Sequence, residues 1–473
     1  MLIPDLILMA MVLALAAWRL FAPGCRPRLR RAGVGLGLLL AAGQWALCGF
    51  TWQSLPAWLL LALSALPPVR TGMVLRWTGR LGLVAVAAAC LGVWILPAVP
   101  KLPAPDGRYG VGTEIYRWTD ASRDEPHTAD PNDRRGVIAQ AWYPTNGRDG
   151  GARLPYIDGI GQMPAQVSVM PGFMLGRDGQ INTHAMAAAP LAPRNRPWPV
   201  VIFSPGYGAP RAVYTGLASR LASRGFVVFV LDHPYEAAVT QLPDGRVVGM
   251  REVFPPDRRQ YMPQQQALRT ADIRFVIDQL ARPEVLSPRL RGGRIEVSKV
   301  AVIGHSFGGA ASAMAMSEDP RVVAAANIDG TPYGDLPERR LTRPFLLLQS
   351  DRAETHHSKL FVDGNARLLA RMTGPTFHYE IGRANHYSFT DAPFFFAPPG
   401  RWLLARVMGG GRGPAATQQA TADILAAFLS GPLTGVDGDV PEVAGRYQGV
   451  AGGPVPTPSP GAKRPPPQDR RLR

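Results

Sequence analysis

The stretch Lys299–Ser317, KVAVIGHSFGGAASAMAMS, decides the fold of this 473-residue chain. Residues 299–303 predict a buried strand, and the small residues after position 309 predict a helix. Between them, residues 304–308 (GHSFG) have the pattern G-x-S-x-G. In this strand–turn–helix context the pattern is typical of a nucleophile elbow, a strained turn that lifts Ser306 above the carboxyl edge of a sheet. The helix that follows points its first N–H groups at the same place, which favours a negatively charged oxygen there.

Strands and helices alternate on both sides of this stretch. Apolar strands are predicted at Gly110–Thr119, Gly136–Tyr143, Pro199–Phe203, Phe226–Leu231, Val322–Ile328, Pro344–Leu348 and Phe377–Ile381. Helices are predicted at Ala212–Arg224, Gln264–Leu280 and Thr417–Leu429, and a hairpin turn at Pro243–Gly245. This alternation predicts an α/β fold, a mostly parallel sheet with helices on both faces.

A serine nucleophile needs a base, and the base needs an acid that orients it. In α/β-hydrolases the chain order is serine, acid, histidine. His386 lies in the loop after the last predicted strand, so we expect it to be the base. His378 lies inside that strand and is expected to be structural. His356 and His357 begin a helix and are expected to be solvated.

Two acids compete for the third position. Asp329 and Asp351 each end a predicted strand after Ser306, both strand ends are used among such hydrolases, and spacing does not decide between them. A second oxyanion donor should come from the loop at residues 204–208, SPGYG. We expect the backbone N–H of Tyr207 there, beside that of Phe307.

His233 ends another strand near the same edge, and we expect it to be a structural hydrogen-bonding residue rather than a second base. No set of residues predicts a metal site, and no cofactor is expected. The cysteines Cys25, Cys48 and Cys90 all lie in the first 100 residues, so neither a disulfide nor a cysteine metal site is possible downstream.

The first 100 residues contain four apolar runs, at Leu2–Phe21, Ala32–Phe50, Leu55–Val69 and Leu81–Val99. A helix of about 20 apolar residues spans the hydrocarbon core, and the third run is marginal. Arginines gather in the first and third loops, which places those loops in the cytoplasm. We therefore expect a multi-pass protein of a bacterial plasma membrane, with its main domain on the extracytoplasmic side. If the third run does not span, that domain faces the cytoplasm.

The expected layout is a four-helix transmembrane region at 1–100, a linker at 101–109, an α/β domain at 110–451 and a tail at 452–473. The tail is Pro-rich and basic, and we expect it to be disordered. The formal net charge of +16 lies mostly outside the α/β domain, since residues 1–100 hold eight Arg and one acidic residue. A nucleic-acid-binding protein should carry its charge on the folded domain, so nucleic acid is not an expected partner.

Six stretches together resemble the platelet-activating-factor acetylhydrolase-like hydrolases. They are AWYP at 141–144, VVIFSPGYGAPRAVY at 200–214, LASRGFVVFVLDH at 221–233, GHSFGGA at 304–310, NIDG at 327–330 and the stretch 382–390. The resemblance implies an α/β-hydrolase fold, favours Asp329 over Asp351 as the acid, and implies hydrolysis of short, oxidised or phospholipid acyl esters without a metal. The SPGYG loop departs from that family and looks like bacterial cutinases and polyester hydrolases, in which the residue equivalent to Tyr207 is an oxyanion donor.

These observations lead us to expect a membrane-anchored serine hydrolase of carboxylic esters, with an ester or lipid substrate and the bilayer as its partners. Residues 150–196 and 234–262 are expected to form the lid and the pocket walls. Three alternatives stay open: the same triad acting on polyester or peptide bonds, acyl transfer to a membrane acceptor, and an inactive fold that serves as a receptor or scaffold.

Overall fold

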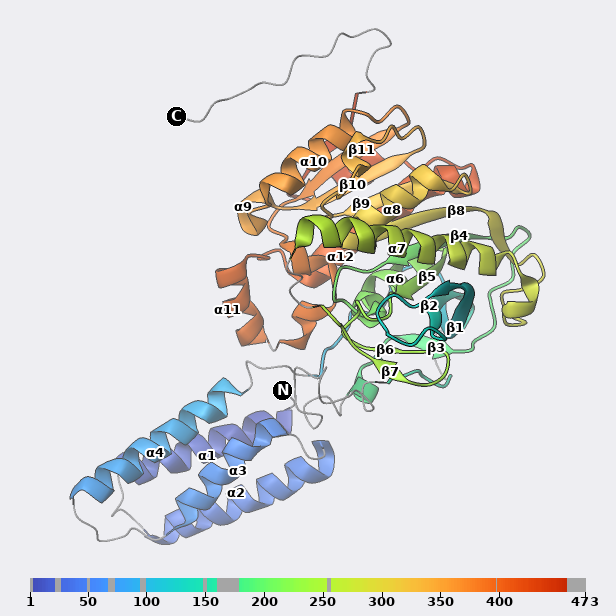
Figure 1. Ribbon diagram of the computed structural model, residues 1–473. Helices are drawn as coiled ribbons and strands as arrows, with labels where there is room; N and C mark the ends of the chain where they lie inside the picture. Colours follow the sequence, from blue (N-terminus) through green and yellow to red (C-terminus); the bar gives the residue numbers. More distant parts are fainter. Residues whose placement is uncertain are drawn as a thin grey trace, which may run out of the picture. The chain divides into compact units, whose positions relative to one another are not determined.

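The computed structural model describes residues 3–21, 27–48, 52–66, 73–93, 99–147, 151–159, 178–252, 257–396 and 398–456. A ten-stranded sheet runs in the order β12-β11-β10-β9-β8-β4-β5-β2-β1-β3 (Figure 1). Its strands are β1 (Gly110–Asp124), β2 (Arg134–Thr145), β3 (Ala185–Ala187), β4 (Trp198–Ser204), β5 (Val227–Asp232), β8 (Ile295–His305), β9 (Val322–Ile328), β10 (Phe345–Ser350), β11 (Thr376–Ile381) and β12 (Val450–Pro454).

The six central strands, from β11 to β5, are parallel, and β2 and β12 join them antiparallel at the two sides. This mostly parallel sheet confirms the predicted α/β-hydrolase fold. The predicted turn at Pro243–Gly245 is also confirmed, because it connects the two antiparallel strands β6 (Thr240–Gln241) and β7 (Val247–Val248).

Helices cover both faces of the sheet, and each face has its own apolar core. On one face lie α7 (Arg258–Leu280), α8 (Phe307–Glu318) and α10 (Lys359–Leu369), with fully buried Ile277 and Ala311. On the other face lie α6 (Thr215–Ser223), α12 (Pro414–Thr434) and α13 (Val440–Gly445), with fully buried Leu221 and Leu425. Because both faces are covered, the central strands are continuously apolar.

The crossing of β4, β8 and α8 leaves no room for side chains at two glycines. A Cβ atom on Gly308 would lie 1.9 Å from the carbonyl oxygen of Ser204, and one on Gly304 would lie 2.3 Å from the carbonyl oxygen of Gly308. Both neighbours are backbone atoms, one at the end of β4 and one in the first turn of α8. The two glycines of G-x-S-x-G therefore set the distance between the elbow and the end of β4.

The carboxyl-terminal boundary differs from the prediction. β12 pairs with β11 through Ala451, Gly452, Gly453 and Pro454, so the domain extends past residue 451, and the expectation of disorder from 452 is wrong at residues 452–454. The segment is rich in Pro and Gly, which do not predict a strand. Proline is nevertheless tolerated in an edge strand such as β12, because one side of an edge strand makes no hydrogen bonds to a neighbouring strand. The rest of the expected tail, 457–473, lies outside the described residues.

The amino-terminal region is helical, with α1 (Ile3–Phe21), α2 (Pro27–Cys48), α3 (Leu55–Ala65) and α4 (Met73–Gly92). It groups as a unit separate from the α/β domain, together with Pro393–Leu404. Over the described residues, one helical segment, Pro4–Phe21, is long and apolar enough to cross a bilayer. α3 has 11 residues and rises about 16 Å, against about 30 Å of hydrocarbon. Among the described helices, α1 therefore fits a membrane span or a signal sequence, and the predicted four spans are reduced to this one candidate.

The packing at Gly308 makes a testable prediction. Gly308→Ala should destabilise the α/β domain by about 3 kcal/mol, because its new methyl group meets fixed backbone. Urea unfolding of the full chain in detergent measures this. Gly445→Ala is the matched control, because a Cβ there meets nothing within 4 Å. Equal stabilities of the two variants would contradict the close approach.

Candidate active site

The elbow forms where β8 meets α8. Ser306 lies between them with φ 55° and ψ −124°, a left-handed conformation that is rare for any residue except glycine. Its backbone N–H donates to the carbonyl oxygen of Ile328, 2.7 Å away, so the turn is tied to the end of β9. Ser306 is partly exposed. Phe307 is the first residue of α8, so its N–H has no acceptor within the helix.

The predicted nucleophile, base and acid form one hydrogen-bonded line. His386 Nε2 lies 3.0 Å from Ser306 Oγ, and His386 Nδ1 lies 2.7 Å from Asp329 Oδ2. His386 begins the short helix η7 (His386–Phe389) and its side chain is 29% exposed, whereas the Asp329 side chain is fully buried. The serine and the imidazole thus face solvent while the acid is shielded from it.

Asp329 follows β9 directly and accepts four hydrogen bonds. Oδ1 accepts from Ser350 N at 2.8 Å and from His357 Nε2 at 2.8 Å, and Oδ2 accepts from Ser350 Oγ at 2.9 Å besides His386. Burial raises the pKa of this carboxyl, but the hydrogen bonds from His357 and His386 outweigh it and hold the pKa well below its usual range. Asp329 is therefore ionised near neutral pH.

His357 is the residue at this site that sequence reasoning missed. The prediction that it is solvated is wrong, because its side chain is 5% exposed and contacts the carboxylate. The helix that begins after it, α10, turns the ring inward against Phe361, with ring centroids 4.0 Å apart. A histidine between two short helices has no local pattern that reveals this orientation.

The alternative acid, Asp351, lies apart from the line. It caps the short helix α9 (Arg352–Thr355), accepting from Ala353 N at 2.8 Å through Oδ1 and from Arg383 N at 2.7 Å through Oδ2. Its carboxylate is thus occupied with backbone donors. Of the two candidate acids, it is Asp329 whose carboxylate contacts His386.

The SPGYG loop lies against the elbow. A Cβ on Gly206 would be 3.2 Å from Ser306 Cβ, so the loop passes directly beside the serine. The rings of Tyr207 and Phe307 meet edge to face with centroids 6.1 Å apart. Tyr207 O–H donates to the carbonyl of Glu252, which ties the loop to the segment 234–262. The two predicted oxyanion donors therefore belong to adjacent residues in space.

A buried arginine supports this arrangement from behind. Arg269 of α7 donates through Nη1 to the Pro205 carbonyl at 2.5 Å, and through Nε to Glu236 at 2.9 Å. Its guanidinium also lies over the Phe307 ring, 4.7 Å from the centroid. One side chain thus contacts both the loop before Tyr207 and the residue after Ser306.

A relay of hydrogen bonds joins the loop, the elbow and the base. Gly206 N–H donates to Tyr214 Oη at 2.9 Å, Tyr214 Oη lies 2.8 Å from His305 Nδ1, and His305 Nε2 lies 2.9 Å from the His386 carbonyl oxygen. Burial and the charge of His386 lower the pKa of His305 to about 3. Neutral His305 therefore accepts from Tyr214 and donates to the backbone of His386.

A second serine–histidine–aspartate line lies beneath the loop. His233 Nε2 is 2.9 Å from Ser204 Oγ, and His233 Nδ1 is 2.9 Å from Asp272 Oδ2. Asp272 also pairs with fully buried Arg135, 2.7 Å away. Ser204, His233 and Asp272 are all buried. As predicted, His233 makes structural hydrogen bonds, here to the residue that begins the SPGYG loop.

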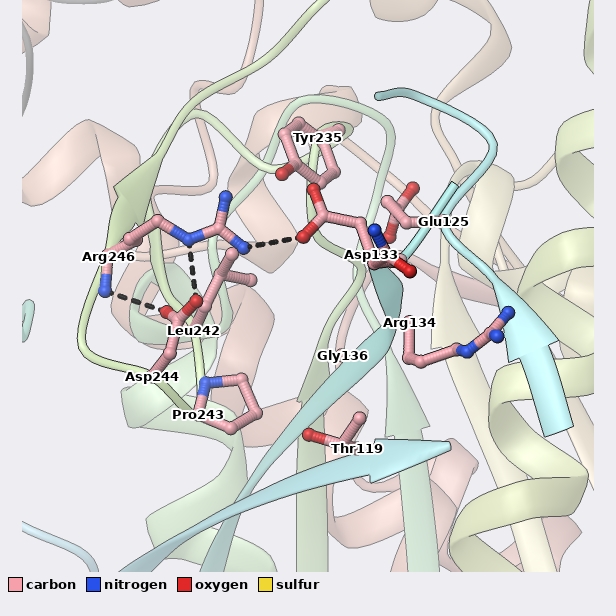
Figure 2. Close-up of a pocket in the computed structure, with 11 residues that line it drawn as sticks. Thr119, Glu125, Asp133, Arg134, Gly136, Tyr235, Leu242, Pro243, Asp244 and Arg246 are labelled. Atoms are coloured by element: carbon pink, nitrogen blue, oxygen red, sulfur yellow. Dashed lines mark hydrogen bonds and ion pairs between the residues drawn. The ribbon is translucent and has the colours of Figure 1, made fainter. Parts of the chain in front are cut away.

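Two cavities differ in their relation to this site. One, of about 480 Å³, is lined by His386 and by residues of α9 and of α11 (Pro398–Met408), among them Glu354, Tyr387, Val407 and Met408. The other, of about 200 Å³, is lined by Asp133, Tyr235, Asp244 and Arg246 (Figure 2). There Arg246 pairs with both aspartates, at 3.0 and 2.5 Å. We assign the first cavity to the site, because it borders the imidazole.

The two segments expected as lid and pocket walls are described in part. Residues 150 and 160–177 of the first and 253–256 of the second lie outside the described residues. Within the second segment, Tyr261 Oη lies 3.2 Å from Tyr207 Oη. The start of α7 thus contacts the predicted oxyanion loop.

The fold belongs to the α/β-hydrolase class, and the similar proteins with known names are carboxylic ester hydrolases. The family model "Platelet-activating factor acetylhydrolase, isoform II" matches residues 99–245 and 289–432. The dienelactone hydrolase family model matches residues 184–345. The first match covers more than half of the chain, so this chain belongs to the platelet-activating factor acetylhydrolase, isoform II family.

Individual relatives agree. A probable 1-alkyl-2-acetylglycerophosphocholine esterase of Arthroderma benhamiae is 25% identical over 63% of this chain and 78% of its own length. Platelet-activating factor acetylhydrolase of Bos taurus is 26% identical over 62% and 69%. The solved ferulic acid esterase from Streptomyces cinnamoneus is 30% identical, with a TM-score of 0.61, over 75% of this chain and 99% of that one.

The contacts of the two acids predict opposite outcomes for the same substitution. Asp329→Asn should lower kcat/KM about 10⁴-fold, because the amide can no longer hold the imidazole in its working tautomer. Asp351→Asn should leave kcat/KM within about threefold and the stability nearly unchanged, because asparagine caps a helix about as well as aspartate. Steady-state ester hydrolysis by the full chain measures both. A large loss in the Asp351 variant alone would reverse the assignment.

Proposed function

We propose that this enzyme cleaves carboxylic esters through an acyl-enzyme on Ser306, with His386 as base and Asp329 as acid. The observation that carries the proposal is the hydrogen-bonded line from Ser306 Oγ through His386 to Asp329, at a strained elbow that solvent can reach. The family to which the chain belongs supports the same chemistry.

In the proposed reaction Ser306 Oγ attacks the ester carbonyl carbon while His386 Nε2 takes the hydroxyl proton. The carbonyl oxygen becomes an oxyanion and accepts hydrogen bonds from the backbone N–H groups of Tyr207 and Phe307. Loss of one such donor typically lowers kcat by about 10²–10³. The tetrahedral intermediate collapses, and His386 protonates the departing alcohol. Water then repeats the sequence on the acyl-enzyme, which releases the acid. Asp329 stabilises the imidazolium that forms twice in each cycle.

Short-chain or lipid-derived acyl esters, including phospholipids, are the proposed substrates. The named relatives act on 1-alkyl-2-acetylglycerophosphocholine and platelet-activating factor, which supports this class. The cavity of about 480 Å³ borders His386, the residue that protonates the alcohol, so we assign the leaving group to it. A second candidate is an aryl ester: the ferulic acid esterase is 30% identical, and Tyr207, Phe307 and Tyr333 form an edge-to-face aromatic row beside the elbow.

We also propose that the amino-terminal helices anchor the enzyme to a membrane. Segment Pro4–Phe21 supports at least one span. The arginines between the apolar runs support cytoplasmic first and third loops and, with four spans, an extracytoplasmic hydrolase domain.

An ester panel tests the proposed function. Full-length enzyme in detergent should hydrolyse p-nitrophenyl acetate, longer p-nitrophenyl esters, a 2-acetyl phospholipid and methyl ferulate, with one class preferred by its kcat/KM. Ser306→Ala should lower turnover by about four to six orders of magnitude. Product analysis with an added alcohol separates hydrolysis from acyl transfer, and a peptide and a polyester complete the panel. A folded wild type that turns over none of these would favour the receptor or scaffold.

Reporter fusions test the topology. Alkaline phosphatase fused after residue 105 should be active, and green fluorescent protein at the same place dark, if the hydrolase domain is extracytoplasmic. The reverse pattern would place the domain in the cytoplasm, as expected if α3 does not span. Fusions after residue 50, between the second and third apolar runs, should report the same side as those after residue 105 if four helices span.

A further inference from the structure

His357 has a contact that the proposed mechanism does not use. Its Nε2 lies 2.8 Å from Asp329 Oδ1, the oxygen that does not face His386, and 3.1 Å from Ser350 Oγ. Because an ionised carboxylate only accepts, this nitrogen must carry a proton. The carboxylate of Asp329 is therefore held between two imidazoles, one on each oxygen.

The other ring nitrogen shows that His357 is not placed to satisfy its own polar groups. Nδ1 is buried and has no hydrogen-bond partner among the described residues. A buried polar atom without a partner costs free energy and calls for an explanation. The ring is also fixed, stacked on Phe361 at an interplanar angle of 14°. Packing and the contact with Asp329 therefore determine its orientation.

We propose that His357 is a positioning residue that holds Asp329 and sets the pH range in which His386 acts as a base. This inference rests on the proposed function. A hydrogen bond on Oδ1 fixes the rotation of the carboxylate, so that Oδ2 stays aligned with His386 Nδ1. It also takes up part of the negative charge, so that the carboxylate stabilises the protonated form of His386 less. Without this contact, His386 would stay protonated to higher pH, so a smaller fraction of it could accept the serine proton.

The direction of this effect does not depend on the charge of His357. A neutral ring withdraws negative charge from Asp329 by its hydrogen bond, and a charged ring would do so more strongly, so its loss makes His386 more basic in both cases. His305 is the ionisable side chain beside His386, with ring centroids 4.6 Å apart; its pKa is lowered to about 3, so it is neutral and donates to the His386 backbone. The charged side chains on the surrounding elements point elsewhere. Lys359 pairs with Asp363, Glu354 accepts from Gly410 N at 2.5 Å, and Arg352 and His356 are exposed.

Four variants of the full-length enzyme test the proposal. His357→Phe keeps the ring that stacks on Phe361 and removes the donor, His357→Gln keeps an N–H donor of similar reach, and His357→Asn keeps an amide that is too short to reach Asp329. His378→Phe is the matched control, since His378 is another histidine with an unpartnered buried Nε2 but lies in β11, away from the site. Active-site titration with a fluorophosphonate counts the competent enzyme, so partial misfolding does not enter kcat.

The readout is the pH dependence of kcat/KM for a p-nitrophenyl ester. We expect the acid limb of His357→Phe to move up by about 0.5–1 pH unit and its kcat at pH 7 to fall about tenfold, with KM unchanged. His357→Asn should show the same shift and the same loss of kcat, and it replaces His357→Phe in the test if that variant does not fold. His357→Gln should stay within about threefold of wild type, with the limb in place, and His378→Phe should match wild type.

Two results would overturn the proposal: profiles of His357→Phe and His357→Asn that superimpose on wild type, or an equal shift in His357→Gln. The Ser306→Ala variant distinguishes this failure from failure of the proposed function. If Ser306→Ala remains active, the mechanism itself is wrong. If Ser306→Ala is inactive but the pH profiles of the His357 variants match wild type, only the proposed role of His357 is wrong.

Discussion

The left-handed backbone of Ser306 is the constraint on which the rest of the site depends. Such a conformation costs about 1–3 kcal/mol and persists only where the surroundings over-determine it. Here the surroundings are the parallel pair β8 and β9, the N–H of Ser306 on the Ile328 carbonyl, and Gly308 packed on Ser204. Because these contacts fix the turn, the serine hydroxyl, the start of α8 and the SPGYG loop meet at one edge of the sheet.

The two serine–histidine–aspartate lines show that hydrogen-bond distances alone do not identify a catalytic serine. Ser204–His233–Asp272 repeats the spacing of Ser306–His386–Asp329 to within about 0.2 Å, yet it is closed to solvent and its carboxylate also pairs with Arg135. Burial lowers the pKa of His233, so that ring stays neutral. Solvent access and the strained turn distinguish Ser306, the proposed nucleophile, from Ser204, whose hydroxyl is buried at the start of the SPGYG loop.

The sequence predicts the parts of this site that follow from local pattern. Continuous apolar strands, the G-x-S-x-G turn and the loop position of His386 are all visible in short windows, and β9 has the predicted bounds. Spacing does not decide between Asp329 and Asp351, because both end neighbouring strands at the same edge. The family resemblance favours Asp329, and its contact with His386 agrees. The role of His357 and the strand β12 could not be predicted from the sequence. The orientation of His357 depends on its packing against Phe361 of α10, and β12 depends on the pairing of a Gly- and Pro-rich segment with β11.

Three histidines lie in or beside the predicted machinery, and their surroundings give them different roles. His305 is buried with a pKa of about 3, so it is neutral near pH 7 and serves as a fixed donor and acceptor in the relay. His357 is buried against Asp329, and its bound proton faces the carboxylate. Of the three it is His386 that combines exposure with contacts to both a serine and a carboxylate. A proton taken from Ser306 can therefore reach only His386 directly, and the other two rings act through the backbone and the carboxylate that hold it.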